Sequence, residues 1–293
     1  MELRVLEYFL AVAREQNISR AAEYLHLTQP TLSRQLKELE GEFGKQLFIR
    51  GKRSITLTEA GLYFRKHAEE IVSLAHRTEA EMRNTDENLV GDIYIGTGES
   101  SSIRNIIRVA HQIQNENPGV HFHIISGDSA DLVDRLEKGL FDFCILFGDF
   151  DQSKFDYILL PFTEKWGVLM SKSAELAAKD TIETKDLWDK PLITSRQAFH
   201  SAPFVNWFGQ EAEELNIVNT YNLIYNATIM ADESMGYVLA LADLVNTEGT
   251  DLCFRPILPE YSIPLSLVWK KYRLQTKASE KFIEAIYKLT EVK

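Results

Sequence analysis

The sequence predicts an N-terminal winged helix-turn-helix, then a long linker helix, then a two-lobed α/β domain. Three observations predict this order. Residues 1–58 hold closely spaced helical patterns followed by a hairpin pattern, residues 59–89 contain no proline, and strand-like and helix-like runs alternate after residue 90. With 293 residues, the chain can bury more than one hydrophobic core. We therefore expect separate folding units at 1–58 and 90–293, joined by a helix at 59–89.

The composition is that of a globular protein without a membrane segment. Hydrophobic residues make up 45% of the chain and charged residues 26%, and no run approaches the roughly 20 apolar residues of a membrane span. Charged residues interrupt the apolar N-terminus, which excludes a signal peptide. Cys144 and Cys253 have neither the number nor the spacing of a disulfide framework or a zinc site. We expect a cytoplasmic protein in which both thiols are buried.

Charge is distributed unevenly along the chain. Residues 1–58 contain nine Lys or Arg and seven Asp or Glu, a net charge of +2. Since the whole chain carries −11, the remaining residues carry −13. The first segment can approach a polyanion, whereas the second would be repelled by one. The two parts are therefore expected to have different partners.

The first 58 residues predict three helices. Apolar residues at helical spacing predict a first helix that ends near Asn17, and Ser19 is the expected N-cap of a short second helix. Thr28 is the expected N-cap of the third helix, with Pro30 in its first turn, where a missing N–H costs nothing. Two short helices so closely joined predict a helix-turn-helix.

The third helix has two distinct faces. Its core side is predicted to hold Leu32, Leu36, Leu39 and Phe43. The other side and the N-terminal end carry donors of the kind that reach base edges and phosphates in a major groove. The candidate DNA-binding residues on this helix are Gln29, Pro30, Thr31, Ser33, Arg34 and Lys37.

A hairpin follows this helix. Gly44 is expected to end the helix, and the next residues alternate like two strands that turn at residues 50–52. Arg50, Lys52 and Arg53 lie near the tip of the hairpin, where a wing would run along the phosphate backbone. The alternative is a small helical bundle with a solvated charged face.

The segment from residue 19 to residue 61 closely resembles the winged helix-turn-helix of the LysR-type transcriptional regulators. Phe43 departs mildly from the family, which commonly has Leu there. The resemblance implies that Arg50 and Arg53 contact phosphates and that five residues of the third helix face an operator: Gln29, Pro30, Thr31, Ser33 and Arg34. The residues that carry it are Ala21-Ala22, Leu25, Gln29-Pro30, Ser33, Leu39-Glu40, Gly44, Leu47-Phe48, Arg50, Arg53, Leu57-Thr58 and Ala60-Gly61.

The linker helix carries apolar and small residues at alternating spacings of four and three, a heptad pattern. A helix of this length is too long to bury such a face against one small neighbour, so we expect a homodimer through residues 59–89; packing on its own domain is the alternative. The resemblance implies paired DNA-binding units on an interrupted palindrome of double-stranded DNA, commonly as a homotetramer, and contact with RNA polymerase. The heptad positions are Phe64, Ala68, Ile71, Ala75, Thr78, Met82, Thr85 and Leu89.

The C-terminal part is expected to form two α/β lobes with mostly parallel strands. We expect the chain to cross between lobes near Pro161 and Pro264, which places lobe one at 91–161 and 265–293 and lobe two at 162–264. Strands are predicted at 92–96, 120–126, 141–147, 166–171, 191–195, 221–225, 252–256 and 264–269, and helices at 102–114, 130–139, 205–215 and 278–289. This order resembles the effector-binding domain of the LysR family, which is akin to periplasmic solute-binding proteins.

Candidate effector-binding residues follow the predicted strands, because ligands in such folds sit at strand carboxyl ends, against helix N-termini. Arg196 is a candidate counter-ion, whereas Glu99 and Asp128 leave a neutral, zwitterionic or amine-bearing effector open. Each residue could instead be an ordinary N-cap. The candidates are Ser100, Ser101, Ser102, Ser126, Thr194, Ser195, Arg196, Gln197 and Asn226.

The sequence favours a regulator whose DNA binding is modulated by a small-molecule effector, and two alternatives remain. One is a ligand-binding scaffold whose winged helix contacts protein. The other is an α/β enzyme, which the motifs disfavour: a dinucleotide-binding pattern at residue 96 is incomplete, since Ser101 stands where its last Gly belongs. Neither a metal-ligand set nor a cofactor motif is found, so no cofactor is expected.

Overall fold

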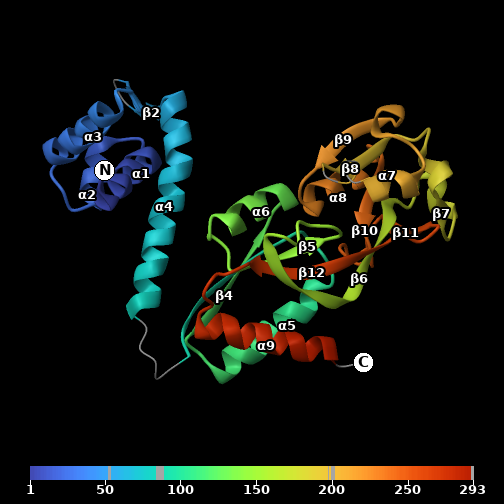
Figure 1. Cartoon of the computed structure of the whole chain (residues 1–293). Helices are drawn as coiled ribbons and strands as arrows, with labels where there is room; N and C mark the ends of the chain where they lie inside the picture. The colour runs from blue at the N-terminus through green and yellow to red at the C-terminus, as the bar shows by residue number, and fades with distance from the viewer. Residues whose placement is uncertain (52–53, 84–88, 197, 199–201, 292–293) are drawn as a thin grey trace. The chain divides into compact units, whose positions relative to one another are not determined.

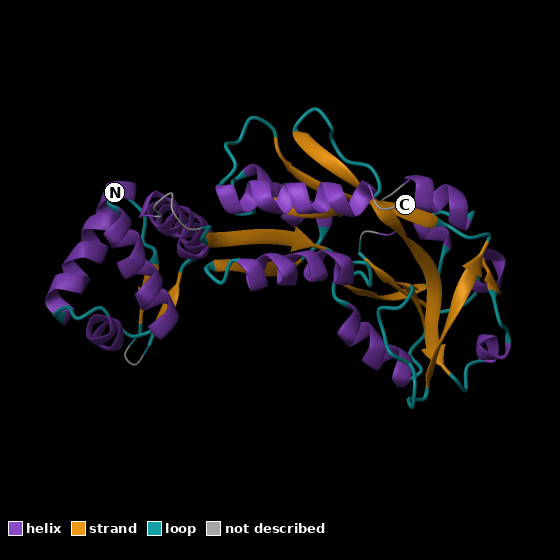
Figure 2. Cartoon of the chain, turned by 90° about the horizontal axis from the view of Figure 1, so that it is seen from below, coloured by secondary structure: helices purple, strands orange, loops and turns teal. Residues whose placement is uncertain are grey.

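The computed structural model describes residues 1–51, 54–83, 89–196, 198 and 202–291. The chain divides into two compact units, Met1–Thr85 and Asp86–Lys293. Figure 2, coloured by secondary structure, shows the first unit as mostly helical and the second as strands lined by helices. Figure 1 labels their elements along the chain.

The first unit begins with three helices, α1 (Leu3–Glu15), α2 (Ile18–Tyr24) and α3 (Gln29–Phe43). Thr28 caps α3 as predicted, because its hydroxyl accepts a hydrogen bond from the Thr31 N–H. The predicted cap of α2 is wrong: Asn17, rather than Ser19, accepts from the N–H groups of Ser19 and Arg20. An Asn side chain reaches two amides of the first turn from a position outside the helix, which a Ser inside that turn cannot do.

The core of the first unit holds the predicted apolar face of α3. Leu32, Leu36 and Leu39 are buried together with Phe9 of α1. Phe43 differs from the prediction, since 44% of its surface is exposed. It lies in the last turn of α3, where the core ends, and contacts only the ring of Phe64 among the described aromatic side chains, at 5.3 Å between centroids.

A hairpin and a long helix complete the first unit. Strands β1 (Phe48–Arg50) and β2 (Ile55–Leu57) pair antiparallel, and the wing is defined here as residues 48–57. Gly44 ends α3 at a positive φ of 62°, as predicted. Helix α4 (Glu59–Arg83) packs so closely on the residue before the wing that a Cβ on Gly61 would lie 2.1 Å from the Leu47 carbonyl oxygen. Only glycine fits at that contact.

The second unit contains one sheet of ten strands, in the order β4-β3-β5-β12-β6-β10-β8-β9, with β11 pairing to β6 and β7 to β11. Lobe one is defined by β3 (Gly91–Thr97), β4 (Val120–Ser126), β5 (Phe143–Phe147), α5 (Ile103–Glu116), α6 (Ser129–Glu137) and α9 (Lys277–Glu291). Helices α5 and α9 cover one face of its sheet and α6 covers the other (Figure 1). Each layer buries the apolar stripe of its helix.

Lobe two has the same layered plan with shorter helices. Its strands are β7 (Ile182–Glu183), β8 (Leu192–Ser195), β9 (Ile217–Tyr221), β10 (Tyr237–Leu241) and β11 (Leu252–Leu258). One face carries the short helices η1 (Glu175–Ala178) and η2 (Thr184–Leu187) with α7 (Ala202–Phe208), and the other face carries α8 (Ile224–Asp232). A further turn, η4 (Ala212–Glu214), precedes β9.

Two long strands run through both lobes. β6 (Phe155–Ser171) pairs with β12 (Ser262–Lys270) along its first part and with β10 and β11 along its second. Pro161 and Pro264 lie within these two strands. β6 and β12 are antiparallel to their neighbours, whereas β3, β4 and β5, and likewise β8, β9 and β10, are parallel sets.

Two segments of lobe two differ from the predictions. Residues 221–225 do not form a strand: β9 ends at Tyr221 and α8 begins at Ile224. Residues 205–215 do not form one helix, because α7 ends at Phe208 and Gly209 follows it at a φ of 81°. Among the described residues, no helix combines the length and apolar character needed to cross a membrane.

Candidate nucleic-acid interface and ligand cleft

The outward face of α3 presents the predicted donors to solvent. Gln29, Pro30, Thr31, Arg34 and Lys37 are exposed, and Ser33 is half-buried. The Thr28 cap and the Pro30 ring leave the first turn accessible while fixing its geometry. Donors thus project from the N-terminal half of one helix, the part that enters a major groove in helix-turn-helix proteins.

The cations of this surface are held in place by weak ion pairs. The Arg34 guanidinium lies 3.7 Å from the Glu38 carboxylate one turn along α3, and both side chains are more than half exposed. Arg50 on β1 lies 3.7 Å from a carboxylate oxygen of Glu40. The Arg34 pair is exposed and contributes little, so its guanidinium remains available to an external anion. The Glu40 side chain is only 14% exposed, whereas the Arg50 side chain is 38% exposed and still reaches solvent. Lys52 and Arg53, the other predicted wing contacts, lie outside the described residues.

Glu40 connects the recognition face to the wing, a role that the sequence analysis missed. One of its oxygens accepts from the N–H groups of Leu47 at 2.8 Å and Phe48 at 3.1 Å, while the other pairs with Arg50. A single carboxylate therefore fixes the start of β1 relative to α3. Glu40 stands seven residues before Leu47, just ahead of the hairpin, and this position could have predicted a contact between its carboxylate and the amides there.

Helix α4 divides the predicted heptad positions between two environments. Ala68 is buried in the core of the first unit and Phe64 packs against it. Further along, Ile71 and Met82 are 43% and 82% exposed. Leu89 lies beyond α4 and packs against the core of lobe one, and Thr85 lies outside the described residues.

The carboxyl ends of the lobe-one strands carry the first group of ligand candidates. Ser100 is buried, and its hydroxyl donates to the carboxylate of Glu164, which also accepts from the Ser102 N–H at 3.1 Å. Ser101 and Ser102 are half-buried. Ser126 is exposed at the end of β4, in register with Thr97 of β3. The register places Ser126 and the loop of residues 98–102, called the serine loop below, at one edge of the sheet.

The second group lies at the carboxyl ends of the lobe-two strands. Thr194 is buried and Ser195 is half-buried, in register with Tyr221 of β9. Arg196 is exposed, and its N–H donates to the Tyr221 carbonyl at 3.2 Å. Asn226 is exposed in the first turn of α8 rather than after a strand. Gln197 lies outside the described residues.

A hydrogen bond between the lobes shows that these two edges face each other. The Ile224 N–H, the first of α8, donates to the Glu99 carboxylate of the loop after β3 at 2.5 Å. The hydroxyl of Tyr221 donates to the Leu239 carbonyl beside this contact, and burial, followed by the negative charge of Glu99, raises the Tyr221 pKa. The Glu99 carboxylate therefore lies between the loop after β3 and the start of α8.

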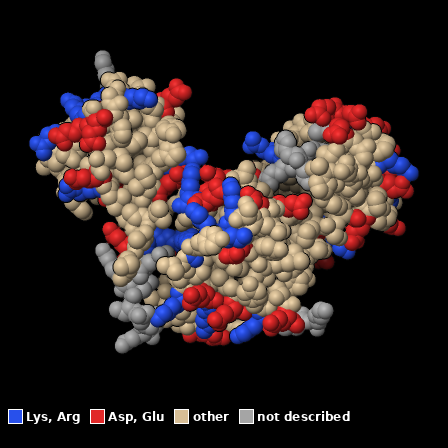
Figure 3. Space-filling view, in the orientation of Figure 1, with Lys and Arg blue, Asp and Glu red and all other residues tan. Residues whose placement is uncertain are grey.

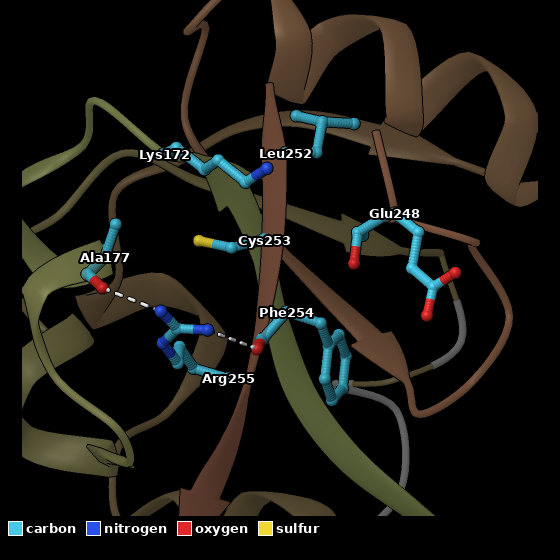
Figure 4. Close-up of a pocket in the computed structure, with 8 residues that line it drawn as sticks. Lys172, Ala177, Glu248, Leu252, Cys253, Phe254 and Arg255 are labelled. Atoms are coloured by element: carbon cyan, nitrogen blue, oxygen red, sulfur yellow. Dashed lines mark hydrogen bonds between the residues drawn. The ribbon is translucent and has the colours of Figure 1, made fainter. Parts of the chain in front are cut away.

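A separate hollow lies in lobe two, on the outer side of β11, with a volume of about 330 Å³ (Figure 4). Its guanidinium, Arg255, donates to the carbonyl oxygens of Lys179 at 2.7 Å, Ala177 at 3.0 Å and Phe254 at 3.1 Å. Each of its nitrogens is therefore engaged by the backbone, which assigns Arg255 a structural role. None of the predicted ligand residues lines this hollow.

The remaining titratable candidates have structural partners. His123 lies 3.0 Å from Asp92 and stacks on Tyr94, and within the described part of the chain no group of three metal-ligating side chains occurs. Both cysteines are buried as predicted, and burial raises the pKa of the Cys144 thiol to about 12. The Cys144 thiol is therefore not a nucleophile near neutral pH.

The surface charge follows the uneven sequence charge only in part. On the face of the first unit that Figure 3 shows, Lys and Arg alternate with Asp and Glu, while acidic groups gather over the region of β9 and α7. The first unit is therefore not uniformly basic. Its cations matter by their position on α3 and the wing rather than by number.

Comparisons with known proteins agree with both units. Residues 3–62 match the family model described as the bacterial regulatory helix-turn-helix protein of the lysR family, and residues 86–290 match the LysR substrate binding domain. The chain is 29% identical over 275 residues to the Hca operon transcriptional activator HcaR of Escherichia coli K12, spanning 92% of each protein. It is 32% identical over 197 residues to the regulator BsdA of Bacillus subtilis, spanning 67% of each.

Solved structures share the whole fold. The crystal structure of CbnR, a LysR family transcriptional regulator, matches with a TM-score of 0.78 and 21% identity over 99% of both chains. Full-length CbnR in complex with its target DNA matches with a TM-score of 0.77. CbnR therefore has the same fold as this chain along its whole length: a helix-turn-helix, a long helix and an α/β domain.

Proposed function

The chain belongs to the LysR family of DNA-binding transcriptional regulators with an effector-binding domain, and from this premise we propose how its residues divide the work. Membership of this family excludes the two alternatives raised by the sequence, an α/β enzyme and a scaffold whose winged helix contacts protein. The observation that carries the proposal is the exposed donor face of α3 beside the Glu40-anchored wing.

We propose that α3 reads an operator and that the wing holds its backbone. Arg34 suits bidentate donation to guanine, and Gln29 suits adenine. Arg50, with Lys52 and Arg53, contacts phosphates and contributes affinity without sequence preference. The proposed base-reading and groove-facing set is Gln29, Pro30, Thr31, Ser33, Arg34 and Lys37.

We propose a homodimer through residues 59–89, between a DNA-binding domain at 1–58 and an effector-binding domain at 90–293. Support comes from α4, where Ile71, Leu74 and Met82 are exposed and lie with Thr78 within an arc of about 80° at 100° per residue. Apolar side chains aligned on one side of a helix favour a second helix as cover. A two-fold dimer would present two α3 helices to an interrupted palindrome, and two dimers would form the homotetramer.

Sedimentation of purified variants tests this pairing. Replacing Ile71 and Leu74 together with Glu is expected to give a monomer at micromolar concentration, because two charges would be buried at the contact. Ser73→Glu is the control, since residue 73 is exposed on the other side of α4. A double variant that stays as associated as the native chain would refute pairing through α4.

We propose that a small-molecule effector binds between lobe one (91–161 and 265–293) and lobe two (162–264). Ser101, Ser102, Ser126, Ser195, Arg196, Gln197 and Asn226 would contact it, and the buried Ser100 and Thr194 would shape the wall behind them. The inter-lobe contact of Glu99 with Ile224 supports this position, because it brings the two strand edges together. By binding two arrangements of the oligomer unequally, the effector would change DNA geometry or contact with RNA polymerase in the cytoplasm.

Asn226→Ala tests the cleft independently of DNA binding. The variant is expected to keep operator affinity and to lose response to an effector found by a thermal-shift screen of metabolites. Thr228, whose hydroxyl donates within α8 to the Ile224 carbonyl, provides the control substitution Thr228→Ala. An unaltered response in the Asn226 variant would remove this residue from the effector-binding set.

A further inference from the structure

Both helices that begin at the cleft already hold carboxylates from the chain itself. At the start of α5, Glu164 is only 2% exposed and accepts from the Ser102 N–H and the Ser100 hydroxyl. At the start of α8, Glu99 accepts from the Ile224 N–H. Glu164 comes from β6 and Glu99 from the loop after β3. Neither segment is adjacent in sequence to the helix whose first amides donate to its carboxylate.

The α8 contact fills a position that a helix normally fills with its own N-cap. The residue before α8 is Leu223, whose side chain offers no acceptor, and no side-chain cap from it is present. The partial positive charge at a helix start attracts anions, so Glu99 sits where an external carboxylate would otherwise bind. A ligand carboxylate at this point would have to displace Glu99 or lie against its negative charge.

We infer that Glu99 is a specificity-determining residue whose carboxylate occupies the start of α8 and so excludes carboxylate ligands from it. The same hydrogen bond, called the clasp below, holds lobe one to lobe two. The inference rests on the proposed effector cleft and narrows its ligand class. The group that meets Glu99 in the cleft is a hydrogen-bond donor, such as an ammonium or amide, rather than a carboxylate. Such a donor satisfies Glu99 while leaving the clasp closed.

Chemical rescue with acetate tests this assignment in the full chain. In Glu99→Ala the α8 start is open, so sodium acetate is expected to raise the Tm saturably beyond the effect of sodium chloride at equal ionic strength. The native chain and the exposed-site control Glu213→Ala should respond to acetate as they do to chloride. A Glu99→Ala variant that responds no more than the native chain, or a native chain that itself binds acetate saturably, would overturn the inference.

Hydrogen exchange provides a second readout that does not depend on the Glu99→Ala variant folding well. In Glu99→Gln the acceptor shape is kept but its charge is lost, and the first-turn amides of α8 should exchange about tenfold faster. Amides at the start of α6, which Asp128 caps within lobe one, serve as the internal control. Unchanged exchange at α8 would contradict the clasp.

Failure of this inference and failure of the proposed function are distinguishable on the same samples. The acetate and exchange measurements need no DNA, whereas operator binding by fluorescence anisotropy does not involve Glu99. A chain that shows acetate rescue but no DNA binding would sink only the proposed function. A chain that binds DNA without acetate rescue would overturn only the assignment of Glu99.

Discussion

The two units use charged side chains in opposite ways. The DNA-binding unit keeps its cations on the surface, with Arg34 in an exposed ion pair and Arg50 in a long pair with the largely buried Glu40. The effector unit takes carboxylates inside, where Asp142 and Glu164 are 2% exposed. Net charge alone therefore misleads: part of the acidity of the second unit is structural, while the small positive balance of the first is concentrated where an external anion can reach it.

The largest effect is expected from breaking an internal carboxylate. Asp142 pairs with Arg273 at 3.2 Å and accepts from the Tyr94 N–H at 2.9 Å. Asp142→Ala should lower the free energy of unfolding by about 3 kcal/mol, because the half-buried Arg273 guanidinium loses its carboxylate and the Tyr94 N–H loses its acceptor. Chemical denaturation of the full chain measures this. The exposed Asp156→Ala is the control, expected within about 0.5 kcal/mol, and an equally small loss for Asp142 would erase the contrast between the units.

An exposed cation of the first unit should act on binding instead. Arg34→Ala is expected to cost about 1–3 kcal/mol of binding at one position of each half-site, because a bidentate base contact is lost. The unfolding free energy should change by less than about 0.5 kcal/mol, since the pair with Glu38 is solvated. Fluorescence anisotropy on a native duplex and on single-base variants measures the preference. Equal weakening on every sequence would reassign Arg34 to phosphate contact.

A helix cap in the first unit should have an intermediate effect on stability. Asn17→Ala removes the acceptor of two amides at the start of α2 and should cost about 1 kcal/mol. Ser19→Ala is the comparison, expected within about 0.5 kcal/mol because its side chain does not cap the helix. Thermal unfolding ranks the two. A larger loss at residue 19 would restore the cap assignment made from sequence.

The smallest expected effect concerns the wing. Arg50→Ala should lower the salt slope of DNA binding by about 0.9, the contribution of one neutralised phosphate, with no change in sequence preference. Titrations at several salt concentrations give the slope. Arg4→Ala, an exposed cation on α1 paired with Glu2, should leave the slope unaltered. An Arg50 variant with the native slope would remove the wing from the phosphate contacts.

The sequence predicted the first unit well because its signals are local. Helical periodicity, the Thr28 cap, Pro30 and Gly44 each specify backbone geometry within a few residues, and all are confirmed. Phe43 was misplaced because periodicity continues to the last turn of α3, whereas the core ends before it. The prediction of Ser19 as the cap is wrong because Asn and Ser both cap helices well. Only the position of the first helical residue distinguishes them, and sequence patterns place a helix start to within one or two residues.

The second unit was harder because its decisive contacts are distant in sequence. The segment 221–225 alternates like a strand, yet the carboxylate of Glu99, more than a hundred residues earlier, receives the first amide of α8. Glu164 likewise reaches the serine loop from the middle of β6. Strand carboxyl ends could be placed from the pattern, but which acidic side chains close them depends on tertiary structure.

Selection of binding sites from a random duplex library tests the central claim most directly. If paired α4 helices present two α3 helices, as we propose, the purified full chain is predicted to enrich two inverted half-sites separated by a fixed spacer. Arg34→Ala should enrich the same spacing with one relaxed position in each half. Enrichment of a single half-site without a repeat, or no enrichment over the starting library, would contradict the account.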